Sequence, residues 1–586
     1  MRRAAALALL ALAALAALAL PARAEDGQLR HPFLAAPVWV YNNWSAYDEL
    51  SDEVPLTEEL ALRELDQLVR LRRAGVRVDY YVMDAFWYDP DGGYRLWRKD
   101  WPHGADAWLD RCRENGIKPG LWFGTNSLVH LNPAETWRDS LTAAGDAMAL
   151  YRGGFLADFM DVLQSWYDHG IRLFKLDFAD FAAAVPGDAK TVSRPRLRRR
   201  NRAALHTALA AFRRRNPDAV LVAFNGFVGD VATAKSAVEY ADVRWLDVFD
   251  SLYAGDPRPS NVPEMNFWRS VDIYSDRMVR RFDLAGVPLA RIDSTGFMIG
   301  DTGTNYGRRT AGWRGMALLT MARGGWINTI HGNLEFLDDA DLRWLAKAQS
   351  LFDALQQAAA FRAFGGFAGD REPYGYEAAA VDGAVYVVVN PAQAEQRAEL
   401  PTLPHGAGGG RHGRVLYHDS GFVPQLEGRA IRLGAGQLAV VGFGRYAGPG
   451  YDLGVGPDIR IPRAIEPLDA PFVRAGAALV YRATLKVPAS GDLRVIMRQR
   501  DQTGQIMRSV SNRSMGEFFT IRAAEGDRVV PVAINYDKVV WSGLSWAAGE
   551  IRRADLTPGA TLTLTLSSQD DDRSLRLEGH VFRVEY

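Results

Sequence analysis

Lys175 and Asp177 are the residues of this chain whose types and spacing most clearly allow covalent chemistry. They follow the run Ile171-Arg172-Leu173-Phe174, which indicates a buried strand. Residues two apart in an extended chain point to the same face, so the Lys175 ammonium can lie near the Asp177 carboxylate and keep it ionised. An ionised carboxylate can act as a nucleophile. Because the same motif also occurs as a surface ion pair, its surroundings must decide between the two interpretations.

The elements around this pair predict a (β/α)8 TIM barrel. From residue 36 to 357, short apolar or β-branched runs alternate with longer segments of helical period, which is typical of parallel strands joined by crossover helices. In this fold the catalytic groups lie at the carboxyl ends of the strands. The eight strands are expected at 38–41, 78–83, 119–123, 173–176, 220–224, 243–249, 289–292 and 326–330.

Polar and aromatic residues lie at or just after these expected strand ends. A ring of carboxylates and tryptophans without clustered histidines fits acid/base chemistry on a neutral, polyhydroxylated ligand. The residues are Asn43, Trp44, Asp84, Trp87, Trp122, Asn126, Asp177, Asp180, Asn225, Asp250, Asp256, Asp293 and His331.

Metal and phosphate chemistry are not expected. A metal-dependent hydrolase on a barrel would need a His-x-His or similar nitrogen cluster, and the first strand leads only into asparagines and an aromatic residue. The chain has no Gly-x-x-x-x-Gly-Lys-Ser/Thr run, and its glycine-rich stretch at 406–413 lies far downstream. We therefore expect neither a metal nor a cofactor.

The motifs at the strand ends resemble those of the retaining α-glycosidases of glycoside hydrolase clan D, which groups α-galactosidase families 27 and 36 with family 31. Asn43-Trp44 resembles the Trp-Asn-Ser-Trp opening of family 27, and Asp84-x-x-Trp87 resembles the Asp-Asp-Gly-Trp of the clan. Residues 116–123 are similar to its Gly-Leu-Lys-Phe-Gly-Leu-Trp strand. The resemblance covers essentially the whole barrel.

This resemblance implies a nucleophile and a proton donor. Lys175-x-Asp177 falls on the Lys-x-Asp whose aspartate is the nucleophile of the clan. Tyr253-Ala254-Gly255-Asp256 resembles the Trp-Ser-Gly-Asp of family 31 and the Trp-Thr-Ser-Asp of family 36, whose aspartate is the acid/base. Pro257 favours an extended Asp256, and aromatic neighbours could raise the pKa of its carboxyl, as leaving-group protonation requires.

Two other aspartates are alternative acid/base residues. Asp250 is closer to the expected strand end. Asp272 lies in Trp-Arg-Ser-Val-Asp-Ile, which resembles the surroundings of the family 27 acid but is one residue short, and its helical spacing favours a place on the sixth crossover helix.

The mechanism that follows is double displacement with net retention. By position and resemblance, the sugar would be bound by Trp44, Asp84, Trp87, Trp122, Lys175, Asn225 and Asp293. α-Galactosidases place two adjacent aspartates against the outer hydroxyls, whereas this chain has Asp84-Ala85, which weakens the case for galactose. The alternatives are an α-glucosidase or α-xylosidase of the same clan, or a non-catalytic glycan-binding protein on the same barrel.

Residues 1–24 predict the compartment of the protein, and residues 360–586 predict two further domains. Residues 1–24 have the basic, apolar and small-residue parts of a signal peptide, which predicts export to the periplasm or medium; an uncleaved membrane anchor is the alternative. After cleavage no integral membrane segment is expected. We expect a small antiparallel β-domain at 360–445, a linker at 446–462 and a C-terminal β-sandwich at 463–586. The sandwich would bind carbohydrate or pack on the barrel, and exposed Trp541 and Trp546 would favour binding.

Charge and cysteine content exclude further classes. The 69 basic and 70 acidic residues nearly balance, so no overall field attracts nucleic acid, and the basic run at 194–202 is interpreted as the solvated face of a helix. Cys112 is the single cysteine, which excludes an intramolecular disulfide. The expected partner is an oligosaccharide or polysaccharide, and no motif fixes an oligomeric state.

Overall fold

The computed structural model describes residues 31–44, 46, 55–227, 241–255, 271–294, 297–299, 312–368, 370–402, 412–504, 519–539, 543–570 and 572–586. The predicted signal peptide, Asp256 and Trp541 lie outside these ranges. Within them, no helix has both the length and the apolar character that crossing a lipid bilayer requires.

The first domain is a barrel of parallel strands. Its sheet has the order β7-β6-β5-β4-β3-β2-β1-β9-β8. β7 pairs with β6, and β8, a few residues further along the chain, pairs with β9, so this segment joins the two ends of the sheet and closes it. The strands are β1 (Val38–Asn42), β2 (Tyr80–Met83), β3 (Lys118–Gly124), β4 (Leu173–Asp177), β5 (Val220–Ala223), β6 (Ser251–Tyr253), β7 (Ile292–Asp293), β8 (Met298–Ile299) and β9 (Ile327–Gly332).

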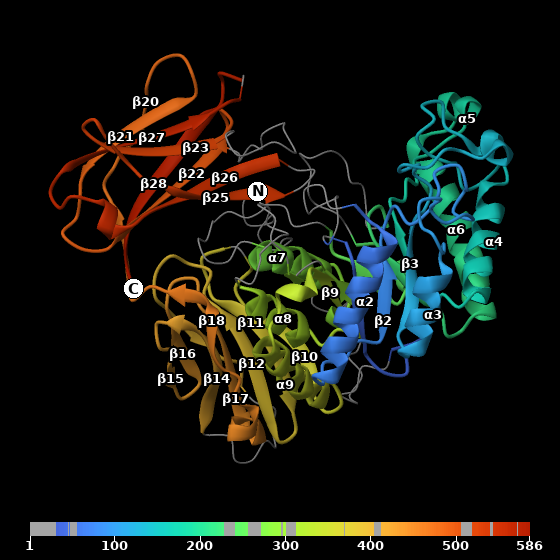
Figure 1. Ribbon diagram of the computed structural model, residues 1–586, viewed down its shortest axis with the longest axis horizontal. Coiled ribbons are helices and arrows are strands. Elements are labelled where there is room, and N and C mark those ends of the chain that lie inside the picture. Colours follow the sequence, from blue (N-terminus) through green and yellow to red (C-terminus); the bar gives the residue numbers. More distant parts are fainter. Residues whose placement is uncertain are drawn as a thin grey trace, which may run out of the picture.

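Helices cover the outside of this barrel (Figure 1). Local signals start several of them: Thr57 caps α2 by accepting from the Leu60 N–H, and Asp338 and Asp341 form a capping box at α9. All residues of α8 are buried, because α8 lies between the barrel and the next domain. The helices are α2 (Glu58–Arg73), α3 (Asp106–Glu114), α4 (Phe155–Asp168), α5 (Pro186–Thr191), α6 (Arg194–Arg215), α7 (Val271–Leu284), α8 (Trp313–Ala322) and α9 (Asp339–Gln356).

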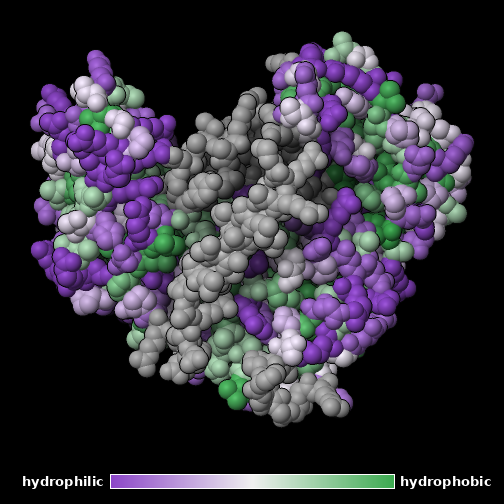
Figure 2. Space-filling view, turned by 180° about the vertical axis from the view of Figure 1, so that it is seen from behind, coloured by the Kyte–Doolittle hydropathy of each residue, from purple (hydrophilic) through white to green (hydrophobic). Residues whose placement is uncertain are grey.

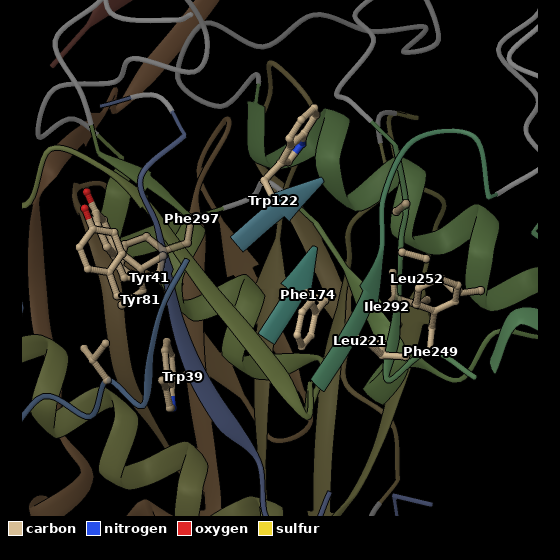
Figure 3. Close-up of a cluster of buried hydrophobic side chains, with 14 of the residues drawn as sticks. Trp39, Tyr41, Tyr81, Trp122, Phe174, Leu221, Phe249, Leu252, Ile292 and Phe297 are labelled. Atoms are coloured by element: carbon tan, nitrogen blue, oxygen red, sulfur yellow. The ribbon is translucent and has the colours of Figure 1, made fainter. Parts of the chain in front are cut away.

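Alternation along the strands divides the side chains between two layers. Tyr41, Tyr81 and Phe174 point outward into the large core between strands and helices, where Figure 3 shows them. Their neighbours Val40, Val82 and Leu173 point into the barrel and pack together there. Because the strand period is two, Lys175 and Asp177 share the inward face of β4 with Leu173.

The sixth strand differs from the sequence prediction. Residues 243–249 were expected to be a strand, but they contain the 3-10 helix Val243–Asp247, and β6 begins only at Ser251. The physical reason is the spacing of Trp245, Val248 and Phe249, whose buried side chains follow a helical period and cover the barrel from outside. Likewise, only the end of the seventh expected strand is extended, as β7.

The second domain consists of two β-sheets. One has the order β10-β11-β12-β17-β14-β18 and the other β13-β16-β15. Their strands are β10 (Ala360–Gly365), β11 (Tyr374–Ala380), β12 (Gly383–Val389), β13 (Gln396–Glu399), β14 (Gly413–Gly421), β15 (Gln425–Glu427), β16 (Ala430–Leu433), β17 (Leu438–Gly444) and β18 (Gly454–Ile461).

The segment 446–462, expected to be a linker, is part of this domain. Its strand β18 pairs in parallel with β14, and Leu453, Ile459 and Ile461 are buried. Its glycine and proline content resembles that of a linker, but these apolar side chains attach it to the domain core.

A buried polar cluster connects this domain to the barrel. Asp276 of α7 accepts hydrogen bonds from the hydroxyls of Tyr374 and Tyr376 on β11, each at 2.9 Å. Arg323, directly after α8, donates to the same carboxylate at 2.7 Å. All four residues are buried. The barrel helices and the second domain therefore share one hydrogen-bonded ion pair.

The C-terminal domain is a sandwich of two five-stranded antiparallel sheets, with orders β19-β28-β22-β26-β25 and β20-β21-β27-β23-β24. A separate hydrophobic core fills the space between them. The predicted fold class, a barrel followed by antiparallel β-domains, is confirmed. The strands are β19 (Ala464–Leu468), β20 (Val473–Arg474), β21 (Val480–Lys486), β22 (Asp492–Arg500), β23 (Phe519–Glu525), β24 (Arg528–Val530), β25 (Ala533–Val539), β26 (Gly543–Ile551), β27 (Thr561–Ser568) and β28 (Arg576–Glu585).

Candidate active site

Asp177 is held at the carboxyl end of β4 by three N–H donors. Its Oδ1 accepts from the backbone N–H of Phe178 at 2.8 Å and of Asn225 at 2.9 Å. Its Oδ2 accepts from the indole Nε1–H of Trp122 at 3.1 Å. A carboxylate has about four lone-pair positions, so one on Oδ2 stays available to a ligand. Asn225 thus contributes its backbone, while Trp122 contributes its side chain.

A close approach of two loops makes this arrangement possible. Gly226 has φ of +95°, and a Cβ at this position would lie 2.1 Å from the Ala179 carbonyl oxygen. Glycine is therefore required where the loop after β5 meets the loop after β4. The Ala179 N–H in turn donates to the Asn225 carbonyl at 3.0 Å.

Burial dominates the electrostatics of Asp177. Only 5% of the residue is exposed, and this burial raises the pKa of its carboxyl to about 6. The nearby Lys175 charge and the Trp122 hydrogen bond lower the pKa in part. At neutral pH the carboxylate remains mostly ionised, which is the form that attacks an electrophile.

Lys175 does not pair with Asp177, although both share one strand face. Its Nζ donates to Asp84 Oδ2 at 2.6 Å, and both side chains are buried. The ammonium also lies 4.0 Å from the ring centroid of Phe224 and 5.7 Å from that of Trp44. Lys175 and Asp84 therefore form a buried ion pair beside the Asp177 carboxylate.

A chain of hydrogen bonds from Asn43 and Glu64 holds Asp84 in place. Its backbone N–H donates to Asn43 Oδ1 at 2.8 Å, and Asn43 Nδ2 donates to Glu64 Oε2 at 3.3 Å. Tyr81 also donates its hydroxyl to Glu64. Burial raises the pKa of Glu64 to about 8, so this carboxyl is largely protonated at neutral pH.

Asp293, at the end of β7, is a third carboxyl group on the inward side. It accepts from the Ser294 N–H at 2.7 Å and lies within 3.4 Å of the Thr329 hydroxyl. Burial raises its pKa to about 6. Asp293, Thr329, Lys175 and Asn42 line part of a cavity of about 10 Å³, which can hold about one water molecule.

His331 and Phe178 are further residues that the predicted sugar-binding set lacks. His331, the last residue but one of β9, is fully buried, and its ring lies 6.0 Å from that of Trp44. Neither of its ring nitrogens has a hydrogen-bond partner among the described residues. Burial, with the Lys175 charge, lowers its pKa to about 3, so its imidazole is neutral. Unpaired buried nitrogens are costly unless a ligand satisfies them. The position of His331 at a strand end was the available sequence signal.

Phe178, directly after Asp177, is 39% exposed and adopts φ of +49°, a conformation that costs a non-glycine residue about 1–2 kcal/mol. Its ring lies edge-on to Trp122 at 6.0 Å. Such an exposed ring beside a buried carboxylate can stack on the apolar face of a sugar. No sequence pattern signalled this strained backbone.

Trp87 was predicted to bind sugar, and its position in the structure contradicts this prediction. Its side chain is fully buried among aromatic rings that include Tyr94, Trp97 and Trp166. Its Nε1–H donates to the Trp122 carbonyl at 2.8 Å. Trp87 thus supports the strand that carries Trp122, and no face of its ring is open to a ligand.

Asp250 was predicted as an alternative acid/base residue, and its position in the structure contradicts this prediction. It precedes β6 and therefore lies at the amino ends of the strands, opposite Asp177. Its fully buried carboxylate pairs with Arg213 at 2.5 Å and accepts from the Leu221 N–H at 2.7 Å. The misplaced sixth strand explains this error: Asp250 comes before the strand rather than after it.

The other two acid/base candidates, Asp272 and Asp256, both come after β6 in the chain. Asp272 lies in the first turn of α7, the helix that follows β6. Asp256 is outside the described residues, but Ala254, two residues before it, donates its N–H to the Asp293 carbonyl at 2.9 Å. The chain therefore leaves β6, just before Asp256, at the same barrel end as Asp177.

Comparison with known proteins gives similarity in structure only. No protein-family model and no curated protein matches the chain. A GH36 α-galactosidase from Geobacillus stearothermophilus in complex with 1-deoxygalactonojirimycin is 12% identical over 71% of this chain and 56% of its own, with a TM-score of 0.49. This chain therefore spans little more than half the length of that enzyme.

Two shorter structures are covered almost completely. A putative α-N-acetylgalactosaminidase from Bacillus halodurans is 14% identical over 70% of this chain and 97% of its own, with a TM-score of 0.45. A GH27 β-L-arabinopyranosidase from Geobacillus stearothermophilus, in complex with arabinose, is 14% identical over 72% and 99%, with a TM-score of 0.47. Similarity this low concerns the fold, so the chemistry rests on the side chains described above.

Proposed function

We propose that the protein is an exported retaining α-glycosidase, most nearly α-galactosidase-like, that hydrolyses terminal α-linked sugars at the carboxyl end of its barrel. Asp177 carries this proposal. It is a buried carboxylate oriented by three N–H donors, with a lone pair on Oδ2 left for a ligand. Export is supported by the signal-like residues 1–24.

The reaction proceeds in two displacements. Asp177 Oδ2 attacks the anomeric carbon, and the bond to the leaving oxygen breaks as Asp256 protonates that oxygen. The product is a glycosyl ester on Asp177. Asp256 then removes a proton from water, which attacks the same carbon, releases the Asp177 carboxylate and leaves the sugar with its original anomeric configuration.

The remaining polar groups suit a sugar with several hydroxyls. Asp84, held by Lys175, and Asp293 can accept hydrogen bonds, and neutral His331 can both donate and accept. Trp44 and Phe178 supply aromatic rings on the same barrel end. With one aspartate where α-galactosidases have two, an α-glucoside or α-xyloside is the alternative substrate.

The test is hydrolysis of α-linked nitrophenyl glycosides by residues 25–586, with the galactoside first. Asp177→Asn is expected to abolish turnover, and Asp177→Gly with azide is expected to restore it with a β-glycosyl azide as product. Asp180→Asn is the matched control, because Asp180 lies in the same loop and accepts from the Ala182 N–H. Full activity of Asp177→Asn would overturn the nucleophile assignment.

The acid/base assignment has its own signature. Asp256→Ala is expected to lose activity on glycosides with poor leaving groups, to retain it with dinitrophenolate, and to give an α-glycosyl azide with azide. Asp272→Ala is the comparison variant, and the azide product identifies which aspartate acts. Specific sugar binding without turnover in the wild type would favour the non-catalytic glycan-binding alternative.

A further inference from the structure

The basic run of α6 is a charged surface that the proposed chemistry does not use. Residues 186–202 contain seven basic residues and one acidic residue, although the whole chain is nearly neutral. Arg194, Arg196 and Arg199 are exposed. We call the arginines at 194, 196, 198, 199, 200 and 202 the α6 arginine cluster.

Among the described residues, the two acids that form ion pairs with the cluster are each shared between two basic residues. Asp188 lies 3.6 Å from Arg152 and 3.8 Å from Arg200. Asp242 lies 2.7 Å from Arg244 and 3.5 Å from Arg202. Within the described part of the chain, these two acids do not pair with the exposed Arg194, Arg196 and Arg199.

This charge is unfavourable for the helix itself. α6 has no acidic residue in its first turn, and arginines four residues apart on one helix face repel each other. After burial, the charges of Arg194 and Arg202 are what lowers the pKa of Arg198. The cluster thus has an electrostatic cost that a bound anion would offset.

The cluster lies at the same end of the barrel as the nucleophile. Asn201 Nδ2 donates to the Phe181 and Ala183 carbonyls at 2.9 Å, in the loop that follows Asp177. Arg213, at the other end of α6, instead reaches Asp250 at the amino ends of the strands. Figure 1 shows α5 above α6 at this end, and the lobe that carries them, on the left of Figure 2, is strongly hydrophilic.

We propose that the α6 arginine cluster binds the acidic residues of an anionic polysaccharide whose α-linked terminal sugar enters the site at Asp177. The inference deepens the proposed function and rests on it. Arginine forms charge-assisted, often bidentate hydrogen bonds with carboxylates, which suits a uronate-containing chain. The adjacent sugar site favours a glycan over other polyanions.

Binding to the Asp177→Asn variant of residues 25–586 tests the proposal without turnover. The probes are a fluorescent oligogalacturonate and, as the neutral α-linked control, a maltooligosaccharide of equal length. Anisotropy at low and high salt is expected to show selective binding of the oligogalacturonate that weakens as salt screens the charges. The double variant R196Q/R199Q is expected to bind about fivefold more weakly, the effect that two exposed charge contacts can have.

R214Q/R215Q is the matched control, because it removes the same charge from the exposed last turn of the same helix, about 27 Å away. It is expected to bind like the parent. Equal losses in both double variants, no preference for the anionic probe, or equally tight binding of a short DNA duplex would each overturn the proposal. Wild-type turnover of neutral glycosides, measured in parallel, shows separately whether the proposed function holds.

Discussion

The ammonium of Lys175 donates to Asp84 at 2.6 Å, although Asp177 shares its strand and its face. The pair joins β4 to the end of β2, and both partners are buried. Lys175 lowers the pKa of Asp177 through space without forming an ion pair with it, and three N–H donors orient the Asp177 carboxylate.

Lys175→Met is expected to destabilise the protein by about 3–5 kcal/mol at neutral pH, because it leaves the Asp84 carboxylate buried without its partner. The double variant Lys175→Met/Asp84→Asn should recover much of this loss, since it removes the uncompensated charge. Chemical denaturation of both variants and of Asp84→Asn completes the cycle. Additive losses would contradict a direct coupling between the two side chains.

Asp177→Asn is expected to become more stable relative to the wild type as pH rises. The folded pKa of Asp177, about 6, lies above its ordinary value, so its folding contribution is full below about pH 4 and is lost as pH rises through 6. The asparagine variant lacks this dependence. The difference in unfolding free energy should shift by about 1–3 kcal/mol between pH 4 and pH 7.5. A pH-independent difference would show that burial does not raise this pKa.

The same protonation governs the acidic limb of activity. The attacking form of Asp177 is the carboxylate, so kcat/KM should fall as pH drops below about 6. A pH profile with a neutral nitrophenyl glycoside measures this limb. Because Asp293 has the same pKa, Asp293→Asn is the control that shows which of the two carboxyl groups sets the limb.

Glu64→Gln is expected to gain stability relative to the wild type as pH rises from about 4.5 to 8, and the difference is expected to stay constant above pH 8. With a pKa of about 8, Glu64 is protonated at neutral pH in the folded protein and ionised in the unfolded chain, so its contribution to stability declines as pH rises from about 4.5 to 8. The slope is about 1.4 kcal/mol per pH unit. Thermal unfolding from pH 5 to 9 tests this, and Glu64→Ala, which cannot accept from Asn43, should also lower activity by displacing Asp84.

Phe178→Gly is expected to raise stability and to lower kcat/KM. Glycine relieves the left-handed backbone at this position, a gain of about 1 kcal/mol, while the exposed ring beside Asp177 is lost. Leu96→Gly is the control, since Leu96 is also an exposed apolar residue but lacks a positive φ. A destabilised Phe178→Gly with unchanged kinetics would indicate a purely structural ring.

The sequence predicted the strands that have long apolar runs. β1 to β5 and β9 lie close to their expected ranges, because each carries several buried β-branched or aromatic residues. β6 could not be predicted, since it has only three residues and the stronger apolar run before it is helical.

For the site, the sequence predicted which strand ends carry polar groups but not how they pair. Lys175 pairs with Asp84 because of the register of β2, β3 and β4, which no local sequence pattern encodes. Trp87 and Trp44 both follow an expected strand end, so the sequence does not distinguish them. In the structure the ring of Trp87 is enclosed by other aromatic rings, whereas the ring of Trp44 lies beside His331. Tertiary packing decides both cases.

The shared carboxylate of Asp276 has a consequence for how this protein can be divided. α7 begins in the same connection that carries Asp256 and is tied to the second domain through two tyrosines. A barrel excised before residue 360 would leave an aspartate and an arginine facing a missing neighbour. The smallest unit that can be expressed without breaking this cluster is therefore the barrel together with its β-domain. The two domains are expected to unfold together and to occur together in related chains.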